Sequence, residues 1–370
     1  MLILFWLCLA LVAYIYLGYP LLLRLGVFGA AINVVSSRVR PLITIIVAAH
    51  NEESAIKAKL ENLLASHYPR DRTEILIGSD GSSDRTEEIV RPFAAEGIGL
   101  ISFPQQQGKS AMQNGLVAHA SGSILVFTDA DCLFAPGALA RLIENFADPR
   151  VGLVTARPSY QNEMETRVTE NESLYLRYET WLRAQESSRG LLAMASGSLF
   201  AICRSLWRPL DPNLGDDFVL PLQVAEAGFL NVLETRSVAV THLSQNEPES
   251  MLRLKIRIIS KDFRALLVHA NLLNPLQYGG TSGSLISHKL LRWFVPYFLL
   301  TLFLTNLYLA GRPFFSALLS LQSAFYAIAL IGFLRNDRGV RNERAAGALA
   351  ALCSLPLSFC IVNLAALLGA

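Results

Sequence analysis

Two aspartates one residue apart, Asp129 and Asp131, directly follow the apolar run 124–127. Side chains two residues apart at the end of a strand point to the same side, so both carboxylates can face one ligand. They would repel each other unless a cation joined them, and Mg²⁺ or Mn²⁺ suits such hard oxygen ligands. Mg²⁺ is commonly held by one or two carboxylates together with substrate phosphates. The pair therefore predicts a divalent metal that meets a nucleoside diphosphate, with a solvated acidic turn as the alternative.

Two earlier segments also place acids just after apolar runs. They are residues 50–53 (His-Asn-Glu-Glu) and residues 80–84 (Asp-Gly-Ser-Ser-Asp). Asp80 could hydrogen-bond to a nucleotide base or ribose, or could form a turn that caps the next helix. The two roles are compatible, and we expect Asp84 to be the capping residue.

Lys109 lies in a Gln-Gly-Lys-Ser segment that invites comparison with a phosphate-binding P-loop. That loop requires a glycine five residues before Gly108, where this chain has Phe103. The first apolar run is also not followed by G-x-G-x-x-G. Both observations argue against a Walker-type ATPase and a dinucleotide-dependent oxidoreductase. Lys109 could still reach a diphosphate as a point charge, or it could be a solvated lysine at the start of a helix.

Asp216 and Asp217 stand immediately before an apolar helical pattern. An acidic N-cap there would complement the helix dipole, and we favour that role for Asp216. Asp217 is the candidate general base, because an acceptor hydroxyl must lose its proton as it attacks the anomeric carbon of a sugar.

A basic amphipathic helix is predicted over residues 249–272. Its cations recur at helical spacing beside an apolar flank, and they are Arg253, Arg257, Lys261 and Arg264. Such a helix is expected to lie at the membrane interface, where its cations meet anionic lipid head groups. In the alternative interpretation, Arg257 also contacts the donor diphosphate.

These residues need a scaffold that brings them together. The β-branched runs 42–47, 74–77 and 124–127 are separated by helix-like patterns, which indicates an α/β domain with a mainly parallel sheet buried on both faces. In open α/β sheets the ligand binds beyond the carboxyl ends of the strands. Each run is followed there by an acid.

The chain is more apolar than a typical soluble enzyme. Its residues are 52% hydrophobic and 17% charged, whereas soluble domains have roughly 45–50% and 25%. Four segments approach the length of roughly 20 residues that spans hydrocarbon. They are residues 2–23, 293–310, 314–334 and 345–370. Basic residues beside them place the intervening domain in the cytoplasm and both termini outside by the positive-inside rule.

We therefore expect a transmembrane anchor at 1–28, a cytoplasmic catalytic domain at 38–246, an amphipathic interfacial helix and linker at 247–289, and three transmembrane helices at 290–370. The expected setting is an integral membrane protein of a bacterial inner or plasma membrane. The five cysteines show no spacing that predicts a zinc site or a disulfide framework. A net charge of +2 is too small to predict a nucleic-acid partner, whereas membrane lipids are expected partners.

The order of these motifs resembles the family-2 glycosyltransferases, in particular the membrane-integrated branch that includes cellulose, hyaluronan and poly-N-acetylglucosamine synthases. The matching segments are 47–53, 79–84, 108–109, 129–131, 196–198 and 216–217. The resemblance implies a GT-A fold and the transfer of a sugar from a nucleotide-sugar donor, a UDP-sugar in our interpretation. The reaction would be a single displacement with inversion.

The resemblance also implies roles for individual residues. Glu52 and Asp80 would help to hold the nucleotide, Asp129 would contact the donor, Asp131 would bind the metal, and Asp217 would be the base. Ser196, Gly197 and Ser198 would lie near the acceptor. His50, Lys109 and Arg257 complete the candidate donor-binding residues.

Two departures from the family pattern affect the expected product. His50 stands where the family usually has tyrosine, and the Q-x-x-R-W motif of processive members maps onto residues 254–258, where only Arg257 survives. The missing tryptophan and glutamine would cradle an acceptor sugar at the mouth of a translocating channel. We therefore expect transfer of one or a few sugars to a lipid-linked or membrane-proximal saccharide acceptor. A processive synthase and a catalytically silent subunit that partners another membrane protein remain alternatives.

Overall fold

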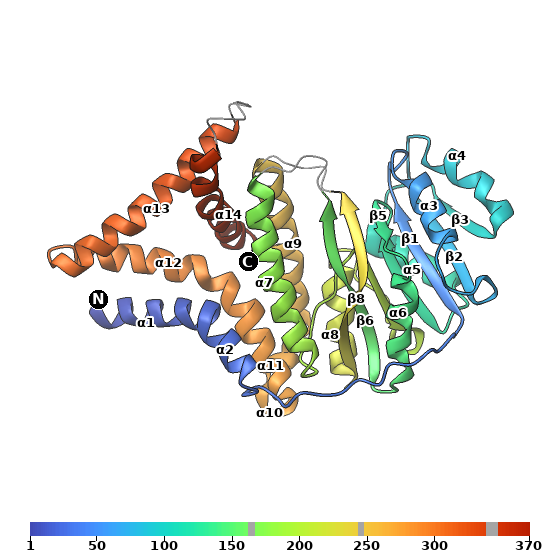
Figure 1. The fold of residues 1–370 in the computed structure, drawn as a ribbon, viewed down its shortest axis with the longest axis horizontal. Coiled ribbons are helices and arrows are strands. Elements are labelled where there is room, and N and C mark those ends of the chain that lie inside the picture. Colours follow the sequence, from blue (N-terminus) through green and yellow to red (C-terminus); the bar gives the residue numbers. More distant parts are fainter. Residues whose placement is uncertain (162–166, 243–247, 338–346) are drawn as a thin grey trace.

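The computed structural model describes the chain except for residues 162–166, 243–247 and 338–346. Its centre is an eight-stranded sheet with the order β3-β2-β1-β4-β7-β6-β8-β5 (Figure 1). The strands are β1 (Ile43–Ala49), β2 (Thr73–Asp80), β3 (Ile98–Phe103), β4 (Ile124–Asp129), β5 (Cys132–Phe134), β6 (Val151–Gln161), β7 (Leu199–Cys203) and β8 (Leu230–His242). The three apolar runs of the sequence are confirmed as β1, β2 and β4.

The sheet is parallel in one half and mixed in the other. β1 pairs in parallel with both β2 and β4, and β2 with β3. β7 runs antiparallel to both of its neighbours, and β5 is antiparallel to β8, while β6 and β8 are parallel. The predicted parallel arrangement therefore holds for the half that carries the acidic strand ends. The carboxyl ends of β1, β2 and β4 lie at one edge.

Helices cover both faces of the sheet. They are α3 (Ile56–Leu64), α4 (Thr86–Val90), α5 (Lys109–His119), α6 (Ala138–Glu144) and α8 (Asp216–Glu226). Alternate residues of β1 enter different cores: Ile45 packs with Leu60 of α3 on one face, and Ile46 packs with Leu116 of α5 on the other. Burial on both faces explains why β1 is a continuous apolar run rather than an alternating pattern.

Two longer helices, α7 (Arg167–Ser187) and α9 (Pro248–Val268), lie between the sheet and the apolar helices (Figure 1). The apolar part of the chain consists of α1 (Leu2–Ala13), α2 (Tyr19–Arg24), α10 (Pro275–Tyr278), α11 (Gly280–Ser284), α12 (Leu291–Tyr308), α13 (Pro313–Asp337) and α14 (Gly347–Gly369). One π-helical turn joins α1 to α2 at Tyr14–Gly18, and another joins α11 to α12 at Leu285–Leu290.

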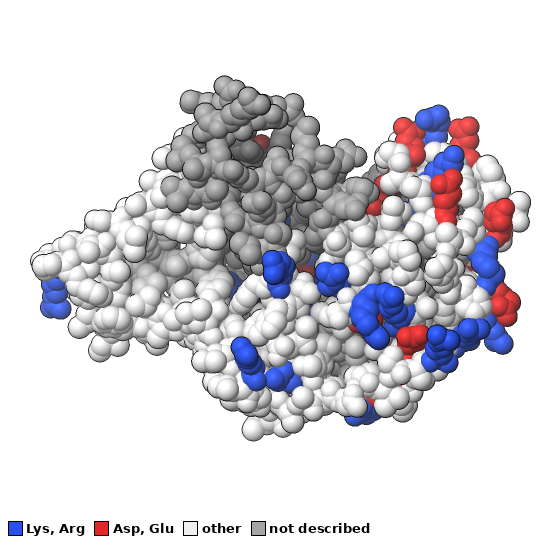
Figure 2. Space-filling model, viewed as in Figure 1, with Lys and Arg blue, Asp and Glu red and all other residues white. Residues whose placement is uncertain are grey.

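Three continuous helical segments in the described part of the chain are long and apolar enough to cross a membrane. They are Leu2–Arg24, Gly280–Tyr308 and Pro313–Leu334. On the face shown in Figure 2, charged side chains gather over the sheet domain, and the helices that project from it are almost uncharged up to a basic tip. This distribution is what helices surrounded by lipid require.

The fourth predicted span, 345–370, corresponds to α14, whose described apolar part is the shorter stretch Leu355–Gly369. A β-carbon added to Gly369 would lie 3.3 Å from the side chain of Ile259, and the Gly369 carbonyl accepts a hydrogen bond from Ser260. The last turn of α14 thus packs against α9, close to the sheet domain, while the N-terminus lies at the far end of α1 (Figure 1). The predicted placement of both termini outside the membrane remains a prediction. The predicted domain boundaries remain predictions.

Candidate active site

Asp80 ends β2 and is almost completely buried. Its two carboxylate oxygens accept hydrogen bonds from the backbone N–H groups of Gln107 and Gly108, at 2.7 and 2.8 Å. The Asp80 carbonyl oxygen is 2.7 Å from Nδ1 of His50. Asp80 therefore holds the loop that leads into α5 and orients the lysine that follows it. A hydrogen bond from Asp80 to the nucleotide remains a prediction.

Asp84, the predicted cap of α4, lies one residue before the N-cap position, which is Arg85, and bonds to the first residue of the helix. Its Oδ1 accepts hydrogen bonds from the backbone N–H and the hydroxyl of Thr86, at 2.9 and 2.6 Å. The Thr86 hydroxyl in turn accepts a hydrogen bond from the backbone N–H of Glu52, at 2.8 Å. Asp84 and Thr86, at the start of α4, thereby also fix the backbone of Glu52 just after β1.

Lys109 connects β4 to the start of α8. Its Nζ lies 2.8 Å from Oδ1 of Asp129 and 3.2 Å from Oδ2 of Asp216. Burial by itself would lower the pKa of Lys109, but Asp129 and Asp216 outweigh it and raise the pKa above its ordinary value. The lysine is thus a permanent cation at the site. Lys109 also begins α5 and its side chain is 36% exposed, as a solvated lysine at a helix start would be, while its ammonium pairs with two acids. Its contact with a diphosphate remains a prediction.

Gly215, rather than the predicted Asp216, occupies the cap position of α8. Asp216 lies in the first turn, where an acid complements the helix dipole as predicted, and its carboxylate contacts Lys109 and Gln113. The Nε2 atom of Gln113 donates to Oδ2 of Asp216 at 2.7 Å. Asp216 is buried, and these contacts pair its carboxylate.

Gly197 lies where the candidate base and the candidate donor-binding residues meet. A β-carbon on Gly197 would lie 3.6 Å from Oδ2 of Asp129, 3.6 Å from Oδ2 of Asp217 and 3.8 Å from Nζ of Lys109. The absence of a side chain leaves room there for a reacting group. The adjacent Ala195 donates its backbone N–H to the carbonyl of Asp217 at 2.8 Å, which ties the loop 191–198 to α8.

The two serines beside Gly197 support this loop. Their hydroxyl oxygens are 2.7 Å apart, and both residues are buried. The Ser196 backbone N–H donates to the hydroxyl of Thr155 at 2.8 Å, and the Ser198 carbonyl accepts from the hydroxyl of Thr128 at 2.7 Å. Ser196 and Ser198 thus hold Gly197 against the site, while their contact with an acceptor remains a prediction.

Asp217 has the electrostatic environment of a general base. Burial, followed by the negative charges of Asp216 and Asp262, raises its pKa to about 7, against the opposing effect of Lys109 and Lys289. A base with a pKa near neutrality is well matched to proton transfer at physiological pH. Asp262 and Lys289 were not singled out from the sequence, since nothing in their local pattern connects α9 or the second π-helical turn to α8.

Glu52, Asp129 and Asp131 influence one another electrostatically around the position that the sequence assigns to a metal. Burial and the charges of Asp131 and Asp129 raise the pKa of Glu52, and burial and Asp129 raise that of Asp131. A divalent cation would relieve this repulsion, so the residues fit a hard metal ion. In the described part of the chain, His, Cys, Asp and Glu side chains do not form a group of three or more with the arrangement of a metal centre. The protein would therefore supply few ligands, and a diphosphate would supply others.

Lys59 is a site residue that the sequence reasoning missed. It is fully buried beneath the turn that carries Asp129 and Asp131. Its Nζ donates to the hydroxyl of Thr128 at 2.7 Å and to the carbonyl of Cys132 at 2.5 Å, just before and just after that turn. The signal was present, because Lys59 falls in the apolar stripe of α3 formed by Ile56, Leu60 and Leu63.

Arg257 is exposed on α9. Its contact with a donor diphosphate therefore remains a prediction, as does the role of His50 in binding the donor.

Part of the chain matches the model of a known family. Residues 44–208 match the model of glycosyl transferase family 2. A probable glycosyltransferase, YdaM, of Bacillus subtilis is 28% identical over 200 residues, which cover 51% of this chain and 48% of that protein. The β-monoglucosyldiacylglycerol synthase of Trichormus variabilis is 30% identical over 162 residues, which cover 43% of this chain and 35% of that protein. The matched regions thus span half or less of these relatives.

The fold has a counterpart along almost its full length. The mannosyltransferase PcManGT from Pyrobaculum calidifontis, solved in complex with GDP-Man and Mn²⁺, superposes with a TM-score of 0.72 and 23% identity. The superposition covers 98% of this chain and 99% of the mannosyltransferase. The predicted GT-A fold with apolar helices at both ends is thereby confirmed.

Proposed function

We propose that the chain, whose residues 44–208 match the model of glycosyl transferase family 2, transfers one or a few sugars from a nucleotide-sugar to an acceptor held at the membrane. The observation that carries the proposal is the space beside Gly197, bordered by Asp217, Asp129 and Lys109. A base, a donor-binding acid and a cation for a departing diphosphate meet there within the reach of one sugar ring.

The reaction would be a single displacement with inversion. The acceptor oxygen bonds to the anomeric carbon as the bond from that carbon to the diphosphate breaks, and Asp217 takes the hydroxyl proton. The electron pair leaves with the nucleoside diphosphate, whose charge Lys109 faces. A Mg²⁺ or Mn²⁺ ion held by Asp131 would stabilise that charge when bound.

The acceptor is proposed to be lipid-linked or membrane-proximal. Three helical segments of spanning length leave the catalytic domain on one side, which keeps its site near a bilayer. The relative from Trichormus variabilis is named as a glycolipid synthase, in keeping with a lipid-bound acceptor. By the positive-inside rule the domain would face the cytoplasm, where nucleotide-sugars are made.

The test uses the full chain purified in lipid, with a panel of UDP- and GDP-sugars and with Mn²⁺, Mg²⁺ or chelator. We expect metal-dependent release of nucleoside diphosphate and a short product that partitions with lipid extract. Asp217→Asn should bind nucleotide and fail to transfer. A long polymer would instead make the chain a processive synthase, and no release with any donor would refute the proposal.

A further inference from the structure

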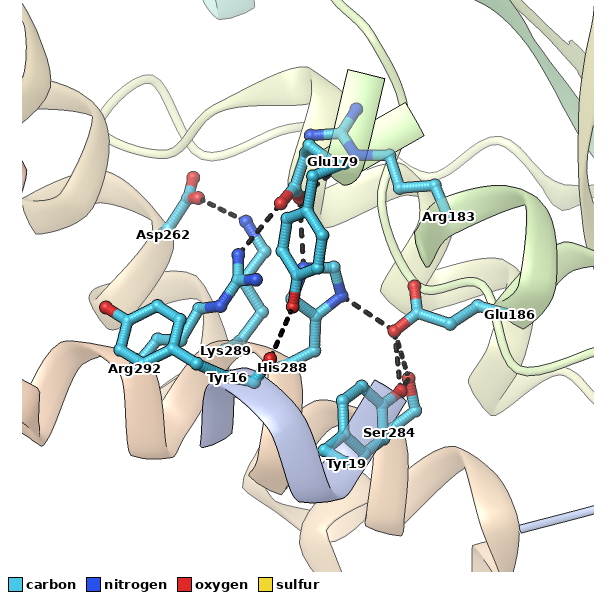
Figure 3. Close-up of polar contacts among 11 residues, drawn as sticks. Tyr16, Tyr19, Glu179, Arg183, Glu186, Asp262, Ser284, His288, Lys289 and Arg292 are labelled. Atoms are coloured by element: carbon cyan, nitrogen blue, oxygen red, sulfur yellow. Dashed lines mark hydrogen bonds and ion pairs between the residues drawn. The ribbon is translucent and has the colours of Figure 1, made fainter. Parts of the chain in front are cut away.

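A buried polar cluster lies away from the active site, where the apolar helices meet α7 (Figure 3). We call it the junction cluster, and its members are Tyr19, Glu179, Glu186, Ser284, His288 and Arg292. The two glutamates come from α7, the tyrosine from α2, and the other residues from the continuous helical segment Gly280–Tyr308. Burying so many polar groups is costly unless each is paired, so the cluster is a specific arrangement.

His288 is the centre of the cluster and is only 2% exposed. Its Nδ1 lies 2.7 Å from Oε1 of Glu186, and its Nε2 lies 3.0 Å from Oε1 of Glu179. Ionised carboxylates only accept hydrogen bonds, so a histidine between two of them must donate from both nitrogens and is an imidazolium. With Arg292, which lies 2.8 Å from the second oxygen of Glu179, two cations balance two anions.

Both glutamates have further partners in the cluster. Glu186 Oε1 also accepts from the hydroxyls of Tyr19 and Ser284, at 2.7 and 3.0 Å. Burial by itself would raise the pKa of Glu179, but His288 and Arg292 hold that pKa well below its ordinary value. The junction cluster is therefore a charged clamp between α7 and two apolar helices.

The junction cluster is connected through Glu186 to the loop 191–198, which carries the candidate acceptor-binding residues. The backbone N–H of Leu191 donates to the carbonyl of Glu186 at 2.9 Å, where α7 gives way to the loop 191–198. That loop is buried from Leu191 to Ser196 and carries Gly197 to the site. The position of Glu186 thus sets the start of the loop.

Lys289, the residue after His288, contacts α9 and α8 beside the active site. Lys289 lies 3.2 Å from Oδ2 of Asp262 on α9, and its ammonium is 4.8 Å from the ring centre of Phe218, the neighbour of Asp217. His288 and Lys289 both lie in the π-helical turn Leu285–Leu290. Such turns often mark functional positions in helices. A single turn of an apolar helix therefore fastens α7 on one side and the α8–α9 pair on the other.

We propose that His288 is a positioning residue, and that the junction cluster fixes the height of the loop 191–198 and Asp217 above the bilayer for an acceptor embedded in the membrane. This inference rests on the proposed function and deepens it. A soluble acceptor would gain nothing from a fixed height, whereas a lipid-anchored hydroxyl can reach Asp217 only at one distance from the bilayer surface.

The first test measures that height without any substrate. The full chain, labelled with fluorescein on Ser54→Cys at an exposed position, is placed in phosphatidylcholine and phosphatidylglycerol vesicles that contain rhodamine-labelled lipid. We expect one narrow energy-transfer efficiency for the parent and a shifted or broadened distribution for His288→Leu. The exposed His67→Leu is the matched control and should behave as the parent. An unchanged distribution in folded His288→Leu would overturn the inference.

The second test separates positioning from chemistry. In vesicles of total lipid extract, His288→Leu should lose transfer to lipid by about 100-fold, the effect of an ~1 Å misplacement of reacting groups, and should keep donor hydrolysis to within about twofold. Equal losses of transfer and hydrolysis would indicate a merely structural role. If His288→Leu does not fold, Glu179→Gln is tested in its place, because it keeps the shape of the side chain and removes one charge from the junction cluster. Failure of the proposed function would appear differently, as no donor cleavage by the parent.

Discussion

Replacing Gly197 by alanine tests whether the space between Asp217 and Asp129 is where the reacting groups meet. The added methyl group would lie 3.6 Å from an oxygen of each aspartate, which is ordinary van der Waals contact. Gly197 is not among the glycines with positive φ, so alanine can adopt its backbone conformation. The free energy of unfolding should therefore change by less than about 1 kcal/mol.

The effect on transfer should be much larger. The methyl group fills space through which an acceptor hydroxyl must approach both Asp217 and the anomeric carbon. Displacing that hydroxyl by ~1 Å costs about 100-fold in rate, which corresponds to about 2.7 kcal/mol of transition-state stabilisation. Metal-dependent nucleotide binding should be retained, because the proposed nucleotide and metal contacts belong to Glu52, Asp80 and Asp131.

The assay is kcat/KM for transfer, measured beside nucleotide affinity and thermal unfolding. Gly311→Ala is the matched control, since a β-carbon at Gly311 would meet nothing within 4 Å. If Gly197→Ala folds, binds nucleotide and transfers sugar at the parental rate, the reacting groups do not meet beside Gly197 and the proposed geometry is wrong.

Three further predictions concern the groups around this space. Asp217 must be ionised to accept a proton, so the rate of transfer should rise with pH through its pKa of about 7. Asp262→Asn should move this rise to lower pH, and Lys289→Met should move it to higher pH. Shifts of both variants in the same direction would contradict the assignment of Asp217 as the base. Burial lowers the pKa of Lys59 to about 8, so the folded state resists protonation at this residue. The stability of the parent relative to Lys59→Met should then rise as the pH increases from about 8 toward the ordinary lysine value, which pH-dependent denaturant unfolding would reveal. Asp131→Asn should weaken Mn²⁺-dependent nucleotide binding at least about tenfold, measured by calorimetry, and an unchanged affinity would remove Asp131 from the metal site.

Much of the scaffold could be predicted because it is encoded locally. The runs that became β1, β2 and β4 are mostly apolar and rich in β-branched residues, because most of their side chains are buried on the two faces of a sheet. Parallel strands align their carboxyl ends, so the acids after each run could be expected at one edge. The apolar helices followed from length and composition alone.

The partners of those acids could not be predicted in the same way. Asp80 uses its carboxylate to hold a loop 27 and 28 residues away, and Asp216 accepts a hydrogen bond from Gln113 rather than capping its own helix. Both alternatives, an Asx-turn and an N-cap, are local arrangements that a sequence pattern suggests first. The tertiary fold overrode them because it offered buried partners.

The sequence by itself determined which strands form, where the acids stand along them and which helices are apolar, because hydrophobic period and strand-end position are properties of neighbouring residues. Only the tertiary structure decided that Lys59 lies beneath the Asp129–Asp131 turn, that Gly197 opens between Asp129 and Asp217, and that His288 clamps α7 to an apolar helix. The hydrogen bonds of Lys59 and His288 join residues about 70 to 110 positions apart. Their stability comes from burial and mutual hydrogen bonding, which exist only once the chain has folded.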